Sequence, residues 1–197
     1  MNKKELIRIF KIKFDHAFHI NVHESFDIKK QIKFIRDINF PLSQLYFFTA
    51  DHKVKNMIKK NLLPAWYDYY VDTKTQTKFY VNYNSTLENR FEHKKQVKNI
   101  NPKLFCSFIH KYKCPFRLRD KYYTYIDKCG VTYETLIGFG KYIHNIEMLE
   151  IFTEVAPKWK GQKTQDQVFD LLNFKGLKLI DIQTINHYQN KSIWIKK

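Results

Sequence analysis

Hydrophobic residues follow two kinds of pattern in the first third of the chain. Apolar and polar residues alternate over 6–14, which predicts a strand with one slip in phase. Isoleucines at helical spacing over 28–38 follow Asp27, a residue type that favours helix N-caps, and predict a helix that ends before the next proline. A second short helix is predicted over 54–63. We expect residues 1–64 to form an N-terminal extension made of these elements.

The rest of the chain alternates between strand and helix patterns. Strands are predicted over 78–84, 104–109, 115–119 and 177–184, and helices over 87–100, 121–128, 132–137 and 168–174. The pattern over 143–155 fits a strand or a short helix equally well. Gly130 and Gly176 follow two of the helices, where glycine commonly caps the C-terminus. This order predicts an α+β domain over 65–197, with a mainly antiparallel sheet and helices packed on one face.

The chain is strongly basic, with 35 Lys and Arg against 19 Asp and Glu in 197 residues, which gives a formal net charge of +16. Hydrophobic residues make up 44%, enough to form a core and to exclude wholesale disorder. Such an excess of positive charge predicts a polyanionic partner, most often a nucleic acid. No stretch reaches the roughly 20 apolar residues of a membrane-spanning helix, so we expect no membrane span.

Residue usage favours a particular cellular compartment. Lys, Asn, Ile, Phe and Tyr are abundant, whereas Gly and Pro occur only 5 times each. The abundant residues have A/T-rich codons, which favours an A/T-rich genome such as that of an organelle. The start of the chain resembles neither a secretory signal nor an imported transit peptide. Cys106, Cys114 and Cys129 have no CxxC spacing and predict reduced intracellular thiols. We therefore expect a protein of the mitochondrial matrix that is encoded by the organelle.

The sequence gives little support for catalysis. Gly138-Phe-Gly140 does not continue into a phosphate-binding glycine loop, and no recognisable catalytic motif is present. We expect no catalytic residue, no cofactor and no metal. His16, His19 and His23 leave one alternative open, since at helical spacing they would share a face and bind a metal ion. We favour a structural role for these histidines.

The strongest functional signal is a basic segment interleaved with aromatic residues over 78–119. Phe105, Tyr112 and Phe116 are candidates for stacking on unpaired bases. The candidate nucleic-acid contacts are Lys94, Lys95, Lys98, Lys103, His110, Lys111, Lys113, Arg117 and Arg119. The alternative is a solvated helix face above an aromatic core.

The most acidic segment lies further along the chain and carries Glu147, Glu150 and Glu154. Two interpretations remain open for these carboxylates. They form either a solvated face or a docking surface for a basic partner protein.

Four segments carry a resemblance to a known family. They are Lys78-Phe-Tyr-Val-Asn-Tyr-Asn84, Cys114-Pro-Phe-Arg-Leu-Arg-Asp-Lys-Tyr-Tyr-Thr-Tyr-Ile-Asp-Lys128, Tyr142 through Ile151-Phe-Thr-Glu-Val155, and Val168-Phe-Asp-Leu-Leu-Asn-Phe-Lys-Gly-Leu-Lys-Leu-Ile-Asp-Ile-Gln-Thr184. In this order they resemble the universal large-subunit ribosomal protein L five, in a divergent mitochondrial form. The resemblance covers residues 65–197.

The resemblance implies a non-enzymatic, structural protein of a mitochondrial large ribosomal subunit, bound to rRNA in the central protuberance. It implies that Asn82 contacts rRNA directly, with Lys103 and Arg119 next, and that Lys78 and Asn84 belong to the same contact set. The acidic segment would then face a basic small-subunit protein in an intersubunit bridge. The expected partners are rRNA and neighbouring ribosomal proteins, and we expect no homo-oligomer.

Three other interpretations stay open. Residues 7–16 resemble the opening strand of the small-subunit ribosomal protein S ten. A phage or plasmid protein acting on nucleic acid, with a metal on the histidine cluster, is a different class. The third is a respiratory-complex subunit held by its basic charge on anionic lipid.

Overall fold

The computed structural model describes residues 3–20, 27–47, 117, 119–127, 130, 132–157 and 162–197. The strands are β1 (His16–Ile20), β2 (Leu45–Phe47), β3 (Tyr122–Ile126), β4 (Ile146–Glu154), β5 (Leu177–Asn186) and β6 (Gln189–Lys196). The helices are α1 (Lys3–Ile9), α2 (Ile28–Asp37), α6 (Thr132–Gly138) and α7 (Gln165–Phe174), with 3-10 turns η1 (Leu42–Gln44) and η5 (Gly140–Asn145).

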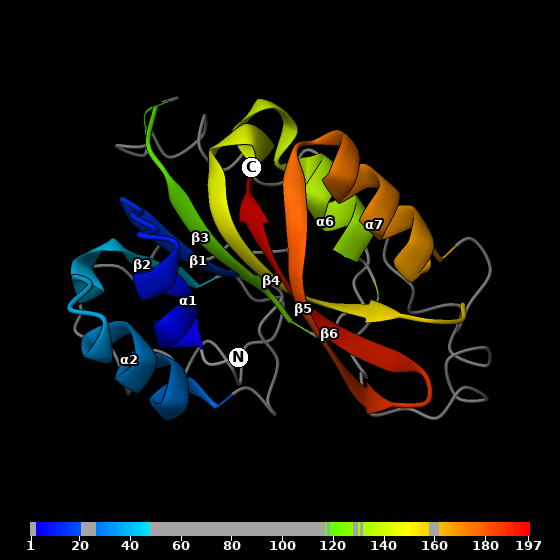
Figure 1. Ribbon diagram of the computed structural model, residues 1–197, viewed down its shortest axis with the longest axis horizontal. Helices are drawn as coiled ribbons and strands as arrows, with labels where there is room; N and C mark the ends of the chain where they lie inside the picture. Colours follow the sequence, from blue (N-terminus) through cyan, green and yellow to red (C-terminus); the bar gives the residue numbers. More distant parts are fainter. Residues whose placement is uncertain are drawn as a thin grey trace, which may run out of the picture.

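The six strands form one sheet in the order β2-β1-β3-β4-β6-β5 (Figure 1). Neighbouring strands from β2 to β4 run parallel, whereas β6 runs antiparallel to both β4 and β5. The connection from β1 to β2 passes through α2, and that from β3 to β4 passes through α6 and η5. The parallel strands β1, β2, β3 and β4 therefore all begin at the same end of the sheet, which is also where β6 ends.

Helices cover both faces of this sheet. On one face, Leu6 of α1 and several residues of α2 pack around Tyr123 of β3. On the other face, Leu136 of α6 and Leu172 of α7 pack around Trp194 of β6. The central strands β1 and β3 are buried at every position as a result.

The expected combination of a sheet with packed helices is confirmed, but the strand directions and the layering differ in detail. Three of the five strand pairings are parallel, and the helices lie on two faces rather than one. Parallel strands that are covered on both faces carry continuous apolar runs instead of the alternation that marks antiparallel strands with one wet face. Strand direction was therefore not readable from the pattern.

The aromatic run over 121–128, predicted as a helix, forms β3 instead. Tyr122, Tyr123, Tyr125 and Ile126 are buried because this strand lies in the middle of the sheet, between β1 and β4. A short run that is apolar on every side has no strand period, so periodicity alone does not separate it from a buried helix.

The N-terminal segment over 6–14, predicted as a strand, begins in α1. Its apolar residues Leu6, Ile9 and Phe10 also recur at i, i+3 and i+4, so the segment fits a helical period as well as a strand period. Leu6 is buried against the sheet, whereas Ile9 and Phe10 remain exposed. Ile7 packs partly against the same core, and Lys3 pairs with Glu150 of β4, so tertiary contacts attach the helix to the sheet.

Other predicted elements are confirmed. α2 begins after Asp27, whose carboxylate accepts a hydrogen bond from the backbone N–H of Lys30 at 3.0 Å. α6, α7 and β5 lie where helices and a strand were predicted, and the undecided segment over 143–155 contains the strand β4. Gly176, with φ of +79°, ends α7 as predicted. The strand β6 was not predicted.

The N-terminal residues belong to the same sheet as the rest of the described chain. β1 pairs with β3 from His16 to Ile20, and β2 pairs with β1. The predicted boundary at residue 64 lies outside the described residues, as do the elements predicted over 54–63, 78–84, 87–100 and 104–109. Arg117 and Arg119, predicted within a strand, lie outside regular secondary structure.

Candidate nucleic-acid interface

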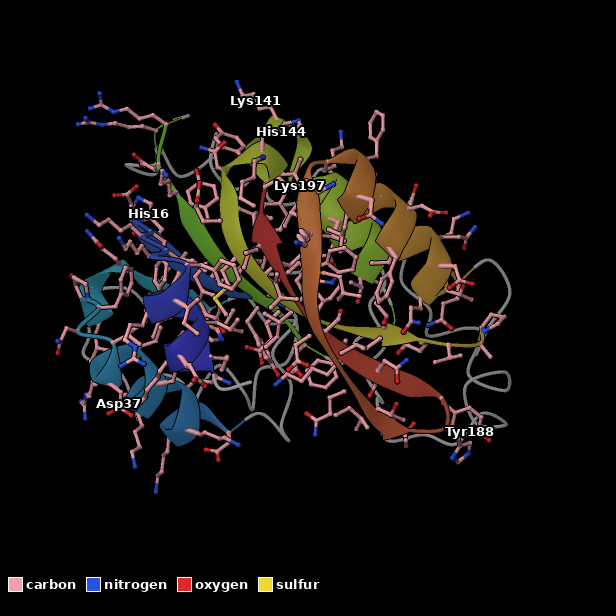
Figure 2. All side chains as sticks on the ribbon, viewed as in Figure 1. His16, Asp37, Lys141, His144, Tyr188 and Lys197 are labelled. Atoms are coloured by element: carbon pink, nitrogen blue, oxygen red, sulfur yellow. The ribbon has the colours of Figure 1, made fainter. Side chains whose placement is uncertain are left out.

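Positive side chains gather at the end of the sheet where the parallel strands begin. They come from the turn before β3, from η5, from the end of α7 and from the end of β6. The set, called the basic surface below, is Arg117, Arg119, Lys121, Lys141, His144, Lys175, Lys196 and Lys197. Figure 2 shows Lys141, His144 and Lys197 near one another at the top of the view.

The carboxylate and the carbonyl of Asp120 hold one half of this surface. Its carboxylate accepts a hydrogen bond from the N–H of Arg117 at 2.6 Å and lies 3.1 Å from Nε2 of His16. Its carbonyl accepts a hydrogen bond from the side-chain amide of Asn145 at 2.6 Å. These contacts fix the turn against the end of η5, and leave the side chains of Arg117 and Arg119 exposed.

Two hydrogen bonds assemble the other half. The N–H of Lys197 donates to the carbonyl of Gly176 at 3.0 Å, which joins the end of β6 to the turn after α7. The ammonium group of Lys196 donates to the carbonyl of His144 at 3.1 Å, which joins it to η5. Lys175 precedes Gly176 directly. Charges from three segments far apart in the sequence therefore lie side by side.

Two lysines of the basic surface contribute to a lowered pKa of His144. It is lowered from its ordinary value by partial desolvation first, and then by the charges of Lys196 and Lys175. A bound phosphate would act in the opposite direction, because an anion stabilises the protonated ring.

The carboxylates near the basic surface are already engaged. Glu147 pairs with Lys121 at 3.3 Å, and Asp15 accepts a hydrogen bond from the N–H of Lys121 at 2.8 Å. The Lys121 side chain is 53% exposed, so this ion pair contributes little to stability. What the arrangement offers chemically is an exposed row of donors and cations suited to phosphate oxygens.

The structure places few of the predicted nucleic-acid contacts. Arg117 and Arg119 lie on the basic surface. The other predicted residues lie outside the described residues: Lys78, Asn82, Asn84, Lys94, Lys95, Lys98, Lys103, His110, Lys111 and Lys113. Sequence reasoning missed Lys141, His144, Lys175, Lys196 and Lys197, because each is a scattered cation in the sequence and only the sheet pairing brings them together. The one sequence signal they share is a position at the end of an element.

Both interpretations of the acidic segment, a solvated face and a docking surface, are wrong for Glu150 and Glu154. Glu150 is fully buried and Glu154 is 3% exposed, while Glu147 is partly exposed and paired with Lys121. These glutamates lie on β4, which pairs with a strand on each side and is covered on both faces. Glu150 and Glu154 therefore cannot present a face to solvent or to a partner protein.

Glu150 is the centre of a buried ionic cluster. Its two carboxylate oxygens contact Lys191 at 2.5 Å and Lys3 at 2.9 Å, and the second also accepts a hydrogen bond from the Tyr123 hydroxyl at 3.0 Å. Burial alone would raise the pKa of Glu150, but the two ammonium groups hold the pKa below its usual range. The cluster ties α1, β4 and β6 together.

The predicted alternative of a histidine metal site on a helix face is also wrong. His16 and His19 lie on the strand β1 and point to opposite faces of the sheet. The His16 ring contacts Tyr46 and Tyr122, whereas the His19 ring stacks on Phe47. The third histidine, His23, lies outside the described residues. In the part of the chain that the structure describes, no group of three His, Cys, Asp or Glu could hold a metal ion.

Comparison with known proteins gives no family for this chain. No protein-family model, no curated protein and no solved structure matches it. None of the helices within the described ranges is long and apolar enough to cross a membrane. The function is therefore inferred from the residues themselves.

Proposed function

We propose that this protein is a structural, non-enzymatic RNA-binding component of a mitochondrial large ribosomal subunit. The observation that carries the RNA-binding part is the basic surface, on which exposed and half-buried cations from four segments lie together in a chain of net charge +16. The assignment to the large subunit rests on the four segments that resemble the ribosomal protein L five.

Binding would be mainly electrostatic. Lysine and arginine side chains neutralise phosphates and release condensed counterions, which supplies most of the affinity and makes it depend steeply on salt. The sheet supplies rigidity, since the basic surface lies on the ends of strands and helices rather than on a long loop. Arg117 and Arg119 add planar donors that bind phosphate in a bidentate manner.

The resemblance is carried by the residues of the four segments and by their order. One element differs from what it implies, since the segment matched to an aromatic helix forms the strand β3. The proposed intersubunit bridge through Glu150 and Glu154 is dropped, because both side chains are buried.

Co-sedimentation tests the proposal. Mitochondrial lysate is resolved on sucrose gradients at low and at high salt, and the native protein is followed across the fractions. We expect it to remain with the large subunit through the high-salt wash. Migration with the small subunit would favour the protein S ten alternative, and a position at the top of both gradients would reject a ribosomal role.

One observation favours a second candidate function, the binding of a nucleotide-sized ligand. At the boundary between β1 and β3 the connections leave in opposite directions, and ligands of open α/β sheets bind outside the carboxyl ends of strands at such a point. Asp127 follows β3 there and is 2% exposed. Its carboxylate accepts a hydrogen bond from Tyr125 at 3.1 Å.

Calorimetric titration with ATP and with NAD tests this second candidate. Saturable binding that is lost in the variant Asp127→Asn would support it. No heat of binding from either compound would reject it.

A further inference from the structure

Phe174 is the most exposed large hydrophobic residue of the described chain, with 83% of its surface open. It is the last residue of α7. The core-facing side of that helix is complete without it, since Val168 and Leu172 are buried and Phe169 packs edge-on against Trp194 at 4.8 Å. Folding therefore gives no reason for a phenylalanine at this position.

The ring lies beside cations of the basic surface. The ammonium group of Lys175 lies 5.3 Å from its centroid. Gly176 then turns the chain, and its carbonyl accepts the hydrogen bond from Lys197. Lys175 and Lys196 both lower the pKa of His144, so Lys175 lies close enough to the basic surface to act on it. Through Lys175, the Phe174 ring adjoins that surface.

An exposed aromatic ring beside a cation, at one side of a basic surface, suits one kind of ligand. Unpaired bases stack on aromatic side chains while adjacent phosphates bind lysine and arginine. Bases within a continuous duplex are covered by their neighbours and do not offer a free face. A protein partner would instead favour an apolar patch around the ring, but Asn173 and Lys175 flank Phe174 in the sequence and the exposed Asp170 lies one helical turn before it.

We propose that Phe174 is a stacking platform for an unpaired base, and that the basic surface binds single-stranded or looped RNA in preference to duplex. This inference rests on the proposed RNA-binding function and names its substrate class. Lys175, whose ammonium group lies beside the ring, holds the phosphate next to the stacked nucleotide, and the exposed cations of the basic surface hold phosphates further along the strand. Because every base has a π-face, the contact selects unpaired RNA without selecting a sequence.

The test measures the affinity of the full chain for a 12-nucleotide oligouridine probe and for a 12-base-pair RNA duplex, by fluorescence anisotropy at fixed salt. We expect Phe174→Ala to weaken oligouridine binding about 5- to 100-fold, as loss of one base stack does, and to change duplex binding less than about twofold. Phe174→Tyr should restore oligouridine binding, because tyrosine keeps the ring.

Tyr188→Ala is the matched control. Tyr188 is 47% exposed and lies in the turn between β5 and β6, away from Lys141, His144 and Lys197 (Figure 2). This variant removes an exposed aromatic ring outside the basic surface and should leave both affinities unchanged. Thermal melts of all variants check that none unfolds.

The outcomes separate the inference from the function beneath it. Wild-type binding to both probes with no effect of Phe174→Ala would overturn the stacking proposal and leave RNA binding standing. An equal loss on both probes would overturn it too. No binding to either probe would reject RNA binding as well. If a protein bound the wild-type chain and not the Phe174→Ala variant, the ring would be assigned to protein docking instead, and the stacking proposal would be overturned.

Discussion

The lysines around Glu150 and the lysines of the basic surface occupy opposite environments. Lys3 and Lys191 have side chains only 19% and 25% exposed, and both direct their charge at one fully buried carboxylate. Lys141 and Lys197 lie exposed on the surface. The same residue type therefore holds the fold together in one region and is available to a ligand in the other.

This difference shows why composition and net charge decide so little by themselves. A buried ion pair costs free energy to desolvate, and removing one partner leaves a charge without compensation. An exposed lysine contributes almost nothing to the free energy of folding, because its ammonium group stays hydrated. Its charge is therefore available to bind a ligand. Exposure, not residue type, separates the two roles.

The largest expected effect is on the buried cluster. Glu150→Gln should lower the free energy of unfolding by about 3 kcal/mol, because two part-buried ammonium groups lose their counter-charge. Glu147→Gln on the same strand is the control and should cost less than about 1 kcal/mol. Urea denaturation measures both, and equal losses would erase the contrast between the two regions.

A pH series sharpens the picture of the same buried region. Burial, with a smaller contribution from Lys3, lowers the pKa of His19 to about 3. The unfolded chain therefore binds a proton near pH 6.5 that the folded chain does not, so the stability that His19 contributes above pH 6.5 is lost as the pH falls toward 3.

The expected slope from His19 approaches about 1.4 kcal/mol of unfolding free energy per pH unit between pH 6 and pH 5. His19→Phe should flatten the curve in that window, since phenylalanine keeps a ring against Phe47 and has no proton to bind. Urea midpoints at several pH values give the slope. Parallel curves for the two proteins would show that His19 is protonated equally in both states.

At the basic surface we expect an effect on binding without an effect on folding. The double variant Lys141→Ala with Lys197→Ala should make the slope of log K for RNA binding against log salt concentration shallower by about 1.4. Each phosphate contact on a single strand contributes about 0.7 to this slope, and the variant removes two. Lys29→Ala with Lys33→Ala, on the exposed side of α2, removes the same charge elsewhere. If both double variants changed the slope alike, net charge rather than this surface would account for binding.

The smallest expected effect concerns Asp170, which lies one helical turn before Phe174 on α7. Asp170→Asn should strengthen RNA binding about twofold, because it removes the repulsion between the Asp170 carboxylate and the bound phosphates. The effect is small, since this repulsion is screened by water. Asp166→Asn, at the other end of the helix, should leave the affinity unchanged. Anisotropy titrations measure both, and a matching gain in the control would remove Asp170 from the surface.

Parts of this fold are predictable from the sequence for identifiable reasons. α2 has a capping aspartate and an amphipathic period, and α7 ends at a glycine with positive φ. β3 and β1 carry no period because both of their faces are buried. The helix α1 satisfies two periods at once, so local pattern does not choose between them.

The candidate site is less predictable than the fold. Arg117 and Arg119 stand in a basic and aromatic segment and were found from it. The Lys196–His144 hydrogen bond and the Lys197–Gly176 hydrogen bond bring η5, the turn after α7 and the end of β6 together, and both depend on where β6 ends beside β5. Glu150 looked like a surface carboxylate, because nothing in the sequence shows that Lys3 and Lys191 converge on it.

Acetylation of lysines, mapped by mass spectrometry on the free and the RNA-bound protein, tests the central claim most directly. The account predicts that Lys141 and Lys197 react in the free protein and are protected by RNA. It predicts that Lys29 reacts in both states, and that Lys3 and Lys191 react slowly in both. Protection of Lys29 with Lys141 and Lys197 still reactive would contradict the placement of the RNA interface.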